Sequence, residues 1–282
     1  MSKYQHIQWY PGHMFKTMKE LKTSLALVDV VIVLLDARIP VSSMNPKLLE
    51  LVSNKPILYI FNKSDLADPN KTQAFMQAFQ NQGNHVIHVS SLDSRMPSKV
   101  IKSLDHIMAP IQEKRQLKGL KDKIYKVLIA GIPNVGKSTF INAMTKKKAT
   151  KTGNTPGVTK QLQWIRIHPK IELLDSPGGL WPKFEDDTVA LNLALTGAIK
   201  DKLLPLDEVV MYGLEFMLKH YPDVLDQRYS VTTLEHALEH IARKRGALLK
   251  GGVIDEERVY HLFLTDLRSH KLGGITLDVL DV

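Results

Sequence analysis

The sequence contains no cysteine among its 282 residues. This absence excludes a disulfide framework and any metal site built on thiolates, and it suits a reducing compartment. Apolar runs long enough to cross a membrane are also missing, and residues 1–20 lack the apolar core of a signal peptide. The sequence shows neither an internal repeat nor a low-complexity tract. We therefore expect a cytoplasmic protein with no membrane partner.

Acidic charge is comparatively scarce, because 29 Asp and Glu stand against 38 Lys and Arg, which gives a formal net charge of +9. A basic chain favours a polyanionic partner such as RNA, and charge that serves only solubility is the alternative. The hydrophobic share of 44% and the charged share of 24% are ordinary for a globular protein. The length allows one large domain or two modest ones.

A glycine-rich segment at residues 131–139 reads GIPNVGKST and matches the phosphate-loop pattern G-x-x-x-x-G-K-[ST]. Residues 124–130 before it form a short apolar run typical of a buried parallel strand, and residues 139–148 after it have helix-forming composition. Strand, loop and helix in this order are the context that the motif requires. A chance glycine-rich turn is the alternative, and the two flanks argue against it.

The chemistry of the phosphate loop assigns roles to its residues. Gly131 and Gly136 let backbone N–H groups turn inward on an anion, at the positive end of the following helix. Lys137 should reach the β- and γ-phosphates, and the Ser138 hydroxyl should bind Mg²⁺. The predicted nucleotide-binding residues of the loop are Asn134, Val135, Gly136, Lys137, Ser138 and Thr139.

A guanine-reading box follows an earlier strand. Residues 57–61 read as that strand, and residues 62–65 (NKSD) lie at its carboxyl end, where open α/β sheets bind ligands. The Asp65 carboxylate can accept hydrogen bonds from two guanine groups that adenine lacks. The Asn62 amide can address N7 and O6 of the base, and the Lys63 stem can lie along it. With the two serines that follow the strand predicted at 85–89, the predicted guanine-site residues are Asn62, Lys63, Ser64, Asp65, Ser90 and Ser91.

The order of these motifs is unusual, because ordinary GTPases carry the phosphate loop first and the guanine box later. The reversed order is a circular permutation, which compact domains tolerate because their termini often lie close together. At this point the sequence resembles the circularly permuted GTPases, and within them the ribosome biogenesis GTPase A (RbgA, or YlqF) family. The resemblance covers nearly the whole chain. Besides the loop and the box, it is carried by residues 9–14 (WYPGHM), 36–40 (DARIP), 155–159 (TPGVT), 175–178 (DSPG), 178–183 (GGLWPK) and 266–269 (DLRS).

Two segments after the phosphate loop read as switches that respond to the γ-phosphate. Asp175 should hold a metal-bound water, and Gly178 should offer its backbone N–H to the γ-phosphate. Thr159 is the expected switch threonine that closes on Mg²⁺, with Thr155 as the alternative. We therefore predict a metal site made by Ser138, Thr159 and Asp175.

The group that orients the attacking water is harder to assign. Ras-like enzymes use a glutamine at the position of Gly179, and the resemblance implies a bulky aliphatic residue there, a role that Leu180 can take. His13 is the predicted catalytic residue, because an imidazole can position or deprotonate water and because the resemblance implies this role. Packing of His13 beside Trp9 is the structural alternative. The resemblance further implies K⁺ as a second cofactor, beside Asn134.

From about residue 186 the pattern changes to successive helices, predicted at 188–200, 206–219, 232–245 and 255–269. We therefore predict an α/β fold in which a circularly permuted P-loop GTPase domain with an N-terminal extension, residues 1–182, precedes a small all-α domain, residues 183–282. The densest basic cluster of the second domain is the predicted RNA-binding site, with a solvated charged face as the alternative. It consists of Arg243, Lys244, Arg245 and Lys250.

The resemblance implies a function for the whole chain. We expect a monomeric factor that binds GTP and GDP, docks on the rRNA of the large ribosomal subunit precursor, promotes its late maturation and leaves after GTP hydrolysis. Two alternatives stay open. One is an RNA-binding assembly scaffold that binds GTP with little hydrolysis, and the other is a GTPase that acts on another RNA.

Overall fold

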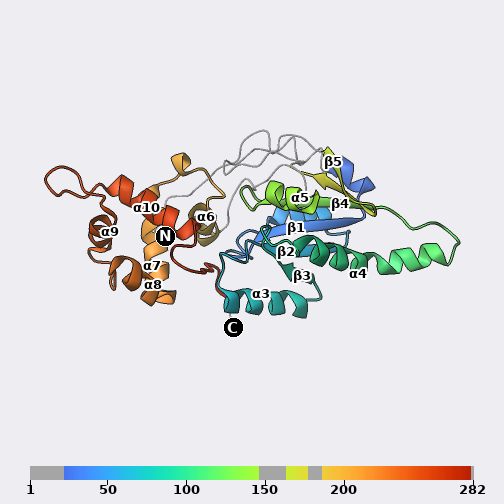
Figure 1. The fold of residues 1–282 in the computed structure, drawn as a ribbon, viewed down its shortest axis with the longest axis horizontal. Coiled ribbons are helices and arrows are strands. Elements are labelled where there is room, and N and C mark those ends of the chain that lie inside the picture. The colour runs from blue at the N-terminus through green and yellow to red at the C-terminus, as the bar shows by residue number, and fades with distance from the viewer. Residues whose placement is uncertain (1–21, 146–162, 177–185, 281–282) are drawn as a thin grey trace.

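The computed structural model describes residues 22–145, 163–176 and 186–280. Within these residues the chain builds a six-stranded sheet with the strand order β3-β2-β1-β4-β6-β5 (Figure 1). Neighbouring strands are parallel, except that the edge strand β5 runs antiparallel to β6. The strands are β1 (Val30–Asp36), β2 (Ile57–Asn62), β3 (His85–His88), β4 (Tyr125–Gly131), β5 (Gln163–His168) and β6 (Ile171–Asp175).

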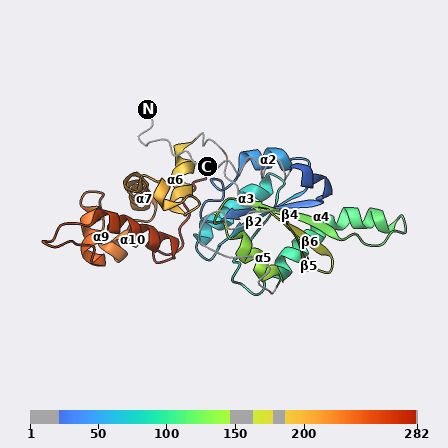
Figure 2. The same ribbon diagram turned by 90° about the horizontal axis from the view of Figure 1, so that it is seen from above.

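Helices cover both faces of this sheet (Figure 2). They are the 3-10 helix η1 (Leu25–Leu27) and the α-helices α2 (Pro46–Val52), α3 (Pro69–Asn81), α4 (Met96–Gln116) and α5 (Lys137–Thr145). Alternate residues of β1 point to opposite faces, as the period of a strand requires. Val30, Ile32 and Leu34 lie in a core with α4 and α5. Val31 and Val33 lie in a second core with α2 and α3. Every residue of β1 is therefore buried, which explains its continuous apolar sequence.

The helix that follows the predicted guanine box begins at a cap encoded in the sequence. The Asp68 side chain accepts hydrogen bonds from the backbone N–H groups of Asn70 at 2.9 Å and Lys71 at 3.1 Å. Pro69 occupies the first turn, where its missing N–H costs no helical hydrogen bond. Because α3 starts so close to residues 62–65, this cap also fixes the loop that carries the box.

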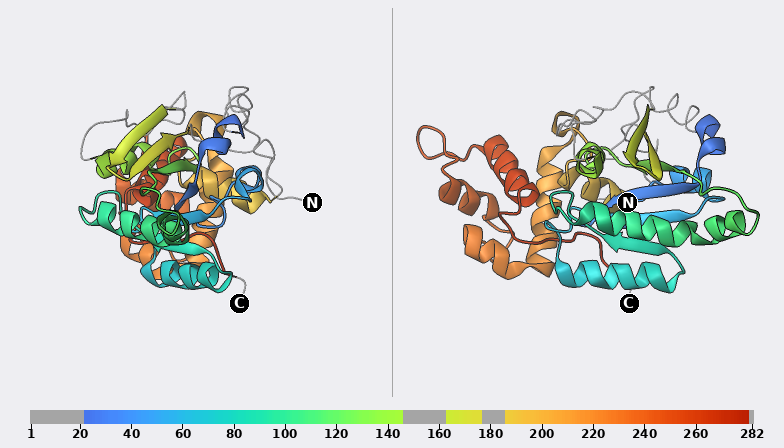
Figure 3. Two further views of the ribbon diagram at one scale, coloured as in Figure 1. Left: turned by 90° about the vertical axis from the view of Figure 1, so that its right-hand side faces the viewer. Right: turned by 45° about the vertical axis from the view of Figure 1, so that its right-hand side comes forward.

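The C-terminal region consists of helices beside the sheet (Figure 3). They are α6 (Asp187–Leu195), the 3-10 helix η2 (Asp201–Leu203), α7 (Leu206–His220), α8 (Pro222–Tyr229), α9 (Ala237–Arg245) and α10 (Glu256–Arg268). Helix α10 packs against α6, α7 and α9. One apolar core runs from the α4–α5 face of the sheet into these helices. In the described part of the chain, no helix is long and apolar enough to cross a membrane.

The predicted helices of this region are found, but two of their boundaries were wrong. The predicted helix at 188–200 ends at Leu195, because Gly197 takes a left-handed conformation with φ +81°. The predicted helix at 232–245 begins only at Ala237. Helix α8 was not predicted. It exists as a separate element because Pro222 ends α7 and fits the first turn of a new helix.

The segment after α10 returns to the sheet. The backbone N–H of Leu277 donates to the Arg38 carbonyl oxygen at 2.7 Å. The buried Asp278 carboxylate accepts from the backbone N–H of Ser42 at 2.9 Å and from the Asn192 side chain on α6 at 3.0 Å. Burial raises the pKa of Asp278, although these donors oppose the rise. The last described residues thus contact both regions, and a division of the chain at residues 182 and 183 stays a prediction.

Candidate active site

Parallel strands bring the predicted nucleotide-site residues to one edge of the sheet. Asp36 at the end of β1 is in register with Asn62 at the end of β2. Gly131 ends β4 beside β1, and Asp175 ends β6 beside β4. Ligands of open α/β sheets bind at this carboxyl edge. The guanine box, the phosphate loop and the predicted metal carboxylate therefore meet, although they are far apart in the sequence.

The phosphate loop presents a buried lysine. Lys137 is 8% exposed, and its Nζ donates to the Gly131 carbonyl oxygen at 3.4 Å. Burial lowers the pKa of Lys137 to about 8, and the charge of Asp175 opposes this shift. Gly136 has φ +97°, and a Cβ atom there would lie 2.5 Å from Nδ2 of Asn62. Only glycine fits this position without a shift of its neighbours, which is why the motif requires it.

Asn62 joins the guanine box to the rest of the site. Its Nδ2 donates to the Val135 carbonyl oxygen at 2.8 Å, and its Oδ1 accepts from the Ser91 hydroxyl at 2.7 Å. The residue is 1% exposed. Both polar atoms of the amide therefore hold protein groups, and the side chain ties the box to the phosphate loop and to the segment after β3. Contact of Asn62 with the guanine N7 and O6 stays a prediction.

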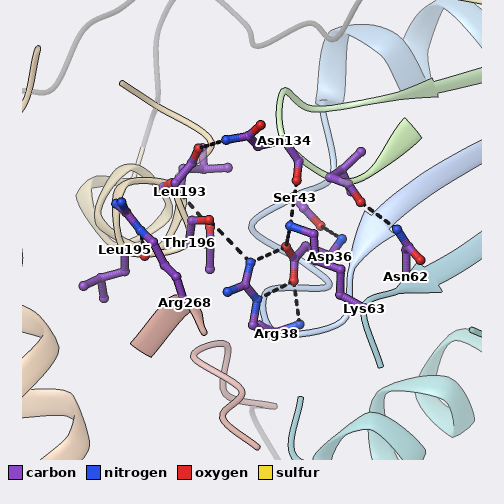
Figure 4. Close-up of polar contacts among 12 residues, drawn as sticks. Asp36, Arg38, Ser43, Asn62, Lys63, Asn134, Leu193, Leu195, Thr196 and Arg268 are labelled. Atoms are coloured by element: carbon purple, nitrogen blue, oxygen red, sulfur yellow. Dashed lines mark hydrogen bonds and ion pairs between the residues drawn. The ribbon is translucent and has the colours of Figure 1, made fainter. Parts of the chain in front are cut away.

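Lys63 connects the box to the phosphate loop by a second route. Its Nζ donates to Oδ2 of Asp36 at 3.0 Å and to the Asn134 carbonyl oxygen at 2.6 Å (Figure 4). Arg38 completes the group with two bonds to the same carboxylate, from Nε at 2.9 Å and from Nη2 at 2.7 Å. Burial by itself would raise the pKa of Asp36, but Arg38 and Lys63 hold it well below its usual range.

Sequence reasoning missed the role of Asp36. Residues 36–40 served there only as one of the segments that carry the family resemblance. The structure shows that Asp36 also joins the guanine box and, through Lys63, the phosphate loop. A signal was available, because an acid and a base two positions apart at the end of a fully apolar strand have to be buried together.

A cavity of about 530 Å³ opens at the carboxyl ends of β2 and β3, between the first turns of α3 and α4. Its lining includes Ser64, Asp65 and Ser90 of the predicted guanine site. The backbone N–H of Ser64 donates to the Val89 carbonyl oxygen at 3.1 Å, which fastens the box to the end of β3. The exposed Asp65 carboxylate is therefore accessible to a base that enters this edge of the sheet.

Two oxygen donors of the predicted metal site lie at this edge. Asp175 is fully buried at the end of β6, and Ser138 stands in the first turn of α5. Among the described residues, no cluster of three or more His, Asp or Glu could hold a metal by itself. A hydroxyl and a carboxylate are ligands that suit Mg²⁺, which usually keeps waters and phosphate oxygens in its shell. This donor set fits a magnesium ion bound together with a nucleotide.

Comparison with known proteins decides the family. Residues 126–244 match the family model described as 50S ribosome-binding GTPase. The chain is 42% identical over 276 residues to Ribosome biogenesis GTPase A of Bacillus pumilus, and the match covers 96% of this chain and 98% of that protein. The chain belongs to the ribosome biogenesis GTPase A family.

Two further comparisons support the assignment to the ribosome biogenesis GTPase A family. The Thermotoga maritima protein of that name is 32% identical over 273 residues, covering 96% of this chain and 94% of its own. The crystal structure of GNP-bound YlqF from T. maritima matches with a TM-score of 0.69 at 27% identity, and covers 93% of this chain and 97% of that one. The predicted family and the permuted α/β fold are confirmed. As a family member the protein is a GTP-hydrolysing factor of ribosome assembly, and GTPases use their nucleotide with Mg²⁺.

The predicted RNA-binding residues of this family member have different environments. Arg243 and Lys244 are exposed on the last turn of α9, and Lys250 is exposed in the turn after it. Arg245 is half-buried, and its Nη2 lies 3.3 Å from Oδ1 of the fully buried Asp266. Arg245 therefore has a structural partner inside the helical region. Contact of all four residues with RNA stays a prediction.

The predicted catalytic residue and the switch residues lie outside the described residues. They are His13, Thr155, Thr159, Gly178, Gly179 and Leu180. Their roles in water activation, in Mg²⁺ binding and at the γ-phosphate stay predictions.

Proposed function

We propose that this GTPase acts on the precursor of the large ribosomal subunit. In its GTP form it docks on the rRNA of the particle, it promotes a late step of maturation, and it leaves after hydrolysis. The observation that carries the proposal is the meeting of the guanine box and the phosphate loop at one sheet edge, in a chain whose residues 126–244 match a 50S ribosome-binding GTPase model. The 50S particle is the large subunit of bacterial ribosomes.

The nucleotide is proposed to bind with its base at Asp65 and its phosphates at the loop. The cavity beside Asp65 supports the first part, because it lies at the carboxyl ends of β2 and β3 where the predicted base-reading residues gather. The buried Lys137 supports the second part. Burial disfavours its charge, and an anionic phosphate beside it would stabilise that charge.

Two cations are proposed to act with the nucleotide. Mg²⁺ would be held by Ser138, by Asp175 through a water and by Thr159, and it would neutralise charge on the transferred phosphoryl group. K⁺ would take the side-chain oxygen of Asn134. The nitrogen of that amide donates to the Gly197 carbonyl oxygen at 2.8 Å, which fixes the orientation of the amide.

Water activation is proposed to depend on His13. Gly179 stands where Ras-like enzymes carry a glutamine, and glycine has no side chain with which to hold a water. An imidazole from the N-terminal segment can perform that step, either by orienting the water or by accepting its proton. If the particle sets the position of His13, hydrolysis would be slow in solution and fast when docked.

The rRNA is proposed to contact the exposed basic end of the helical region, at Arg243, Lys244 and Lys250. Support comes from their exposure and from the formal net charge of +9. Cationic side chains bind the RNA backbone and release its counterions, so such binding weakens as salt rises. The protein is proposed to act as a monomer in the cytoplasm.

The test is co-sedimentation with purified large-subunit precursors, mature large subunits and small subunits, in a non-hydrolysable GTP analogue, in GDP and without nucleotide. We expect binding to the precursor to be at least about tenfold tighter with the analogue than with GDP. Equal binding in both nucleotide states would favour the scaffold alternative. Preferential recovery of another RNA would favour the alternative in which the GTPase acts on an RNA other than that of the large-subunit precursor.

A designed control makes the nucleotide dependence specific. In Asp65→Asn the preference should pass from the GTP analogue to the corresponding xanthosine analogue, because an amide can donate to the O2 that xanthine carries. Precursor binding that follows the xanthosine analogue in this variant would show that the guanine box controls docking. Precursor binding by this variant that is the same with the GTP analogue and with the xanthosine analogue would contradict the proposal.

A further inference from the structure

Side chains from three separate segments bind the carbonyl groups at the end of α6. The carbonyl oxygens of residues 194–197 are four consecutive acceptors. Figure 4 shows Leu195 and Thr196 of this segment beside Arg268 and Arg38. Arg268 from α10 donates to the first two, from Nη2 at 2.8 Å and from Nε at 2.9 Å. Arg38 from the end of β1 donates to the third at 3.4 Å. Asn134 from the phosphate loop donates to the fourth at 2.8 Å.

A helix end offers such acceptors by its nature. The last carbonyl groups of an α-helix have no partner within the helix, and they carry the negative end of its dipole. Here Ala194 and Leu195 are fully buried, so water cannot reach their carbonyl groups. The Gly197 backbone N–H donates to the Ala194 carbonyl oxygen at 3.0 Å, and side chains add the further donors. Two guanidinium groups suit this place because they bring positive charge as well as donors.

Arg268 is fixed in this position by a second partner. Asp201 accepts from Nη1 and from Nη2 of Arg268, both at 2.9 Å. Gly197 gives the guanidinium room, because a Cβ atom there would lie 3.3 Å from its Nε. The guanidinium therefore joins α10, η2 and the end of α6 in one arrangement.

The phosphate-loop partner has an uncommon backbone conformation. Asn134 has φ +59°, in the left-handed region, which residues with a side chain adopt less readily than glycine, although asparagine tolerates it better than most. Such a conformation persists only when its surroundings hold it. Lys63 holds the backbone carbonyl of Asn134 from the side of the guanine box, and Gly197 holds its side chain from the side of the helical region.

We propose that the C-terminal end of α6 is a joint through which the helical region sets the shape of the phosphate loop, and that Arg268 is its positioning residue for GTP hydrolysis. Among the described residues, Arg268 makes its hydrogen bonds with Ala194, Leu195 and Asp201 and with none of the predicted nucleotide site, and it acts by fixing the carbonyl groups beside which Asn134 binds. This inference rests on the GTPase activity of the family, and it adds the claim that the helical region contributes to hydrolysis without contact with the nucleotide.

The first test compares Arg268→Gln with Arg228→Gln. Arg228 is a matched control, because its guanidinium also pairs with a carboxylate of the helical region, Asp266 at 2.8 Å. Within the described part of the chain, Arg228 makes no hydrogen bond with the end of α6. The measurements are the single-turnover rate of GTP hydrolysis at saturating GTP, the affinity for GDP and the melting temperature.

For Arg268→Gln we expect hydrolysis to slow by about tenfold or more, since small displacements of catalytic groups have effects of this size or larger. GDP affinity should stay within about threefold of wild type. Arg228→Gln should lower the melting temperature and leave the rate per folded molecule unchanged. A wild-type rate in Arg268→Gln, or rate losses in both variants that follow their melting temperatures, would overturn the proposal.

The conservative variant separates positioning from stability. In Arg268→Lys the ammonium group can still pair with Asp201, but it lacks the planar fork that serves two carbonyl groups at once. We expect the melting temperature to recover while hydrolysis stays slow. A purely structural role would instead make the rate recover with the melting temperature, and that result would contradict the proposal.

A second experiment measures the distance between the sheet region and the helical region and does not depend on hydrolysis. Because the chain has no cysteine, single cysteines at the exposed Gln80 on α3 and Glu257 on α10 give specific spin labels. We expect one narrow distance distribution in the wild-type background and a broader one with Arg268→Gln. Equal widths of the two distance distributions would contradict the proposal that the end of α6 is a joint. Absence of GTP hydrolysis by the wild type would instead count against the GTPase assignment, which this measurement does not use.

Discussion

Two buried carboxylates, one in each region of the molecule, hold the same kind of partners. Asp36 of the sheet is 2% exposed and binds Arg38 and Lys63. Asp266 of α10 is 0% exposed and binds Arg228 and Arg245. In both places a charge that would be costly to bury is stabilised by cationic side chains and by the hydrogen bonds that they donate.

The two clusters differ in the other groups that their cations contact. Arg38 also donates a hydrogen bond to a carbonyl group at the end of α6, and Lys63 also donates one to the carbonyl group of Asn134 in the phosphate loop. The arginine partners of Asp266 come from α8 and α9, and Lys271 follows α10, so this cluster connects elements of the helical region to each other. The same chemistry thus serves two purposes. The Asp36 cluster connects the nucleotide edge to the helical region, and the Asp266 cluster fixes the helical region itself.

The largest change in nucleotide affinity is expected at the guanine box, whose Lys63 binds Asp36. Asp65→Asn should weaken GTP binding by on the order of 10⁴-fold, because a site built to pair polar groups is left mismatched. The variant should gain xanthosine nucleotides, and titration calorimetry with both would show the exchange. Asp93→Asn, which changes an acid elsewhere in the cavity lining, should keep the guanine preference. GTP affinity within about twofold of wild type in Asp65→Asn would contradict the assignment.

The comparison itself is tested by the pair Asp36→Asn and Asp266→Asn. Asp36→Asn leaves the buried Arg38 without its carboxylate and should cost about 3–5 kcal/mol of unfolding free energy. Asp266→Asn should also destabilise the protein but by less, because Arg228 and Arg245 are partly exposed. Only Asp36→Asn should also weaken GDP binding, because only that cluster holds Lys63 and the phosphate loop. Denaturant unfolding and GDP titration of both variants give the answer. Equal effects of the two variants on GDP affinity would remove the distinction between the clusters.

A third test concerns hydrolysis on the particle. His13→Ala should keep nucleotide affinity and lose on the order of 10²-fold in precursor-stimulated turnover, if the imidazole positions or deprotonates water. His261→Ala, an exposed histidine of α10, is the control for loss of an imidazole elsewhere. Single-turnover rates at full particle occupancy decide the matter. Equal rates would remove His13 from the mechanism, and weak docking with a normal rate once bound would make it a contact residue.

A smaller effect should follow pH. The pKa of Lys137 in the unliganded protein is about 8, so above that pH the site loses the charge that phosphates attract. GDP affinity should therefore fall by about tenfold between pH 7 and pH 9, and the part of the pH dependence that Lys137 causes should vanish below pH 7. Lys137→Arg should lack this dependence, apart from the ionisation of guanine itself, because arginine keeps its proton. An equally steep fall in both proteins would contradict the lysine assignment.

The same group affects stability with the opposite sign. Its folded-state pKa lies below the usual 10.5, so the folded, unliganded protein binds this proton less tightly than the unfolded chain. The stability that neutral Lys137 contributes is therefore complete above pH 10.5 and is lost as the pH falls through about 8. Thermal unfolding without nucleotide, compared between wild type and Lys137→Met, measures this contribution.

The smallest effect is expected in the salt dependence of particle binding. Replacing Arg243, Lys244 and Lys250 with glutamine should make the slope of log K against log salt shallower by nearly one unit per lost phosphate contact. Arg245→Gln should instead lower the melting temperature and change the slope less, because Asp266 already holds this guanidinium. A full unit of slope lost in Arg245→Gln with an unchanged melting temperature would place Arg245 on the RNA surface instead.

Much of the sheet and of the nucleotide site could be predicted from the sequence. A buried parallel strand is a continuous apolar run, so β1 and β2 are visible in the sequence as such. The phosphate loop and the guanine box are visible because their chemistry requires particular residues at fixed spacing. Gly136 is an example, since both its backbone conformation and the closeness of Asn62 exclude a side chain.

The contacts between regions could not be predicted, because they depend on where distant elements end. Asn134 binds a carbonyl group 63 positions away, and that group is available only because α6 stops at Leu195. Arg268 reaches the same helix end from 73 positions away. Helical periodicity reveals which face of α10 is buried, but it does not indicate which side chain caps another helix. Family resemblance marked residues 36–40 and 266–269 without explaining that both bind one helix end.

The central claim is that the ribosomal precursor switches on this GTPase. Its most direct test is single-turnover GTP hydrolysis by the wild-type protein alone, with mature large subunits and with saturating large-subunit precursor. We expect the precursor to accelerate hydrolysis by at least about tenfold and the mature subunit to have little effect, as for GTPases completed by a partner. An unchanged rate at saturating precursor, with binding intact, would contradict the claim and favour an assembly scaffold that binds GTP with little hydrolysis.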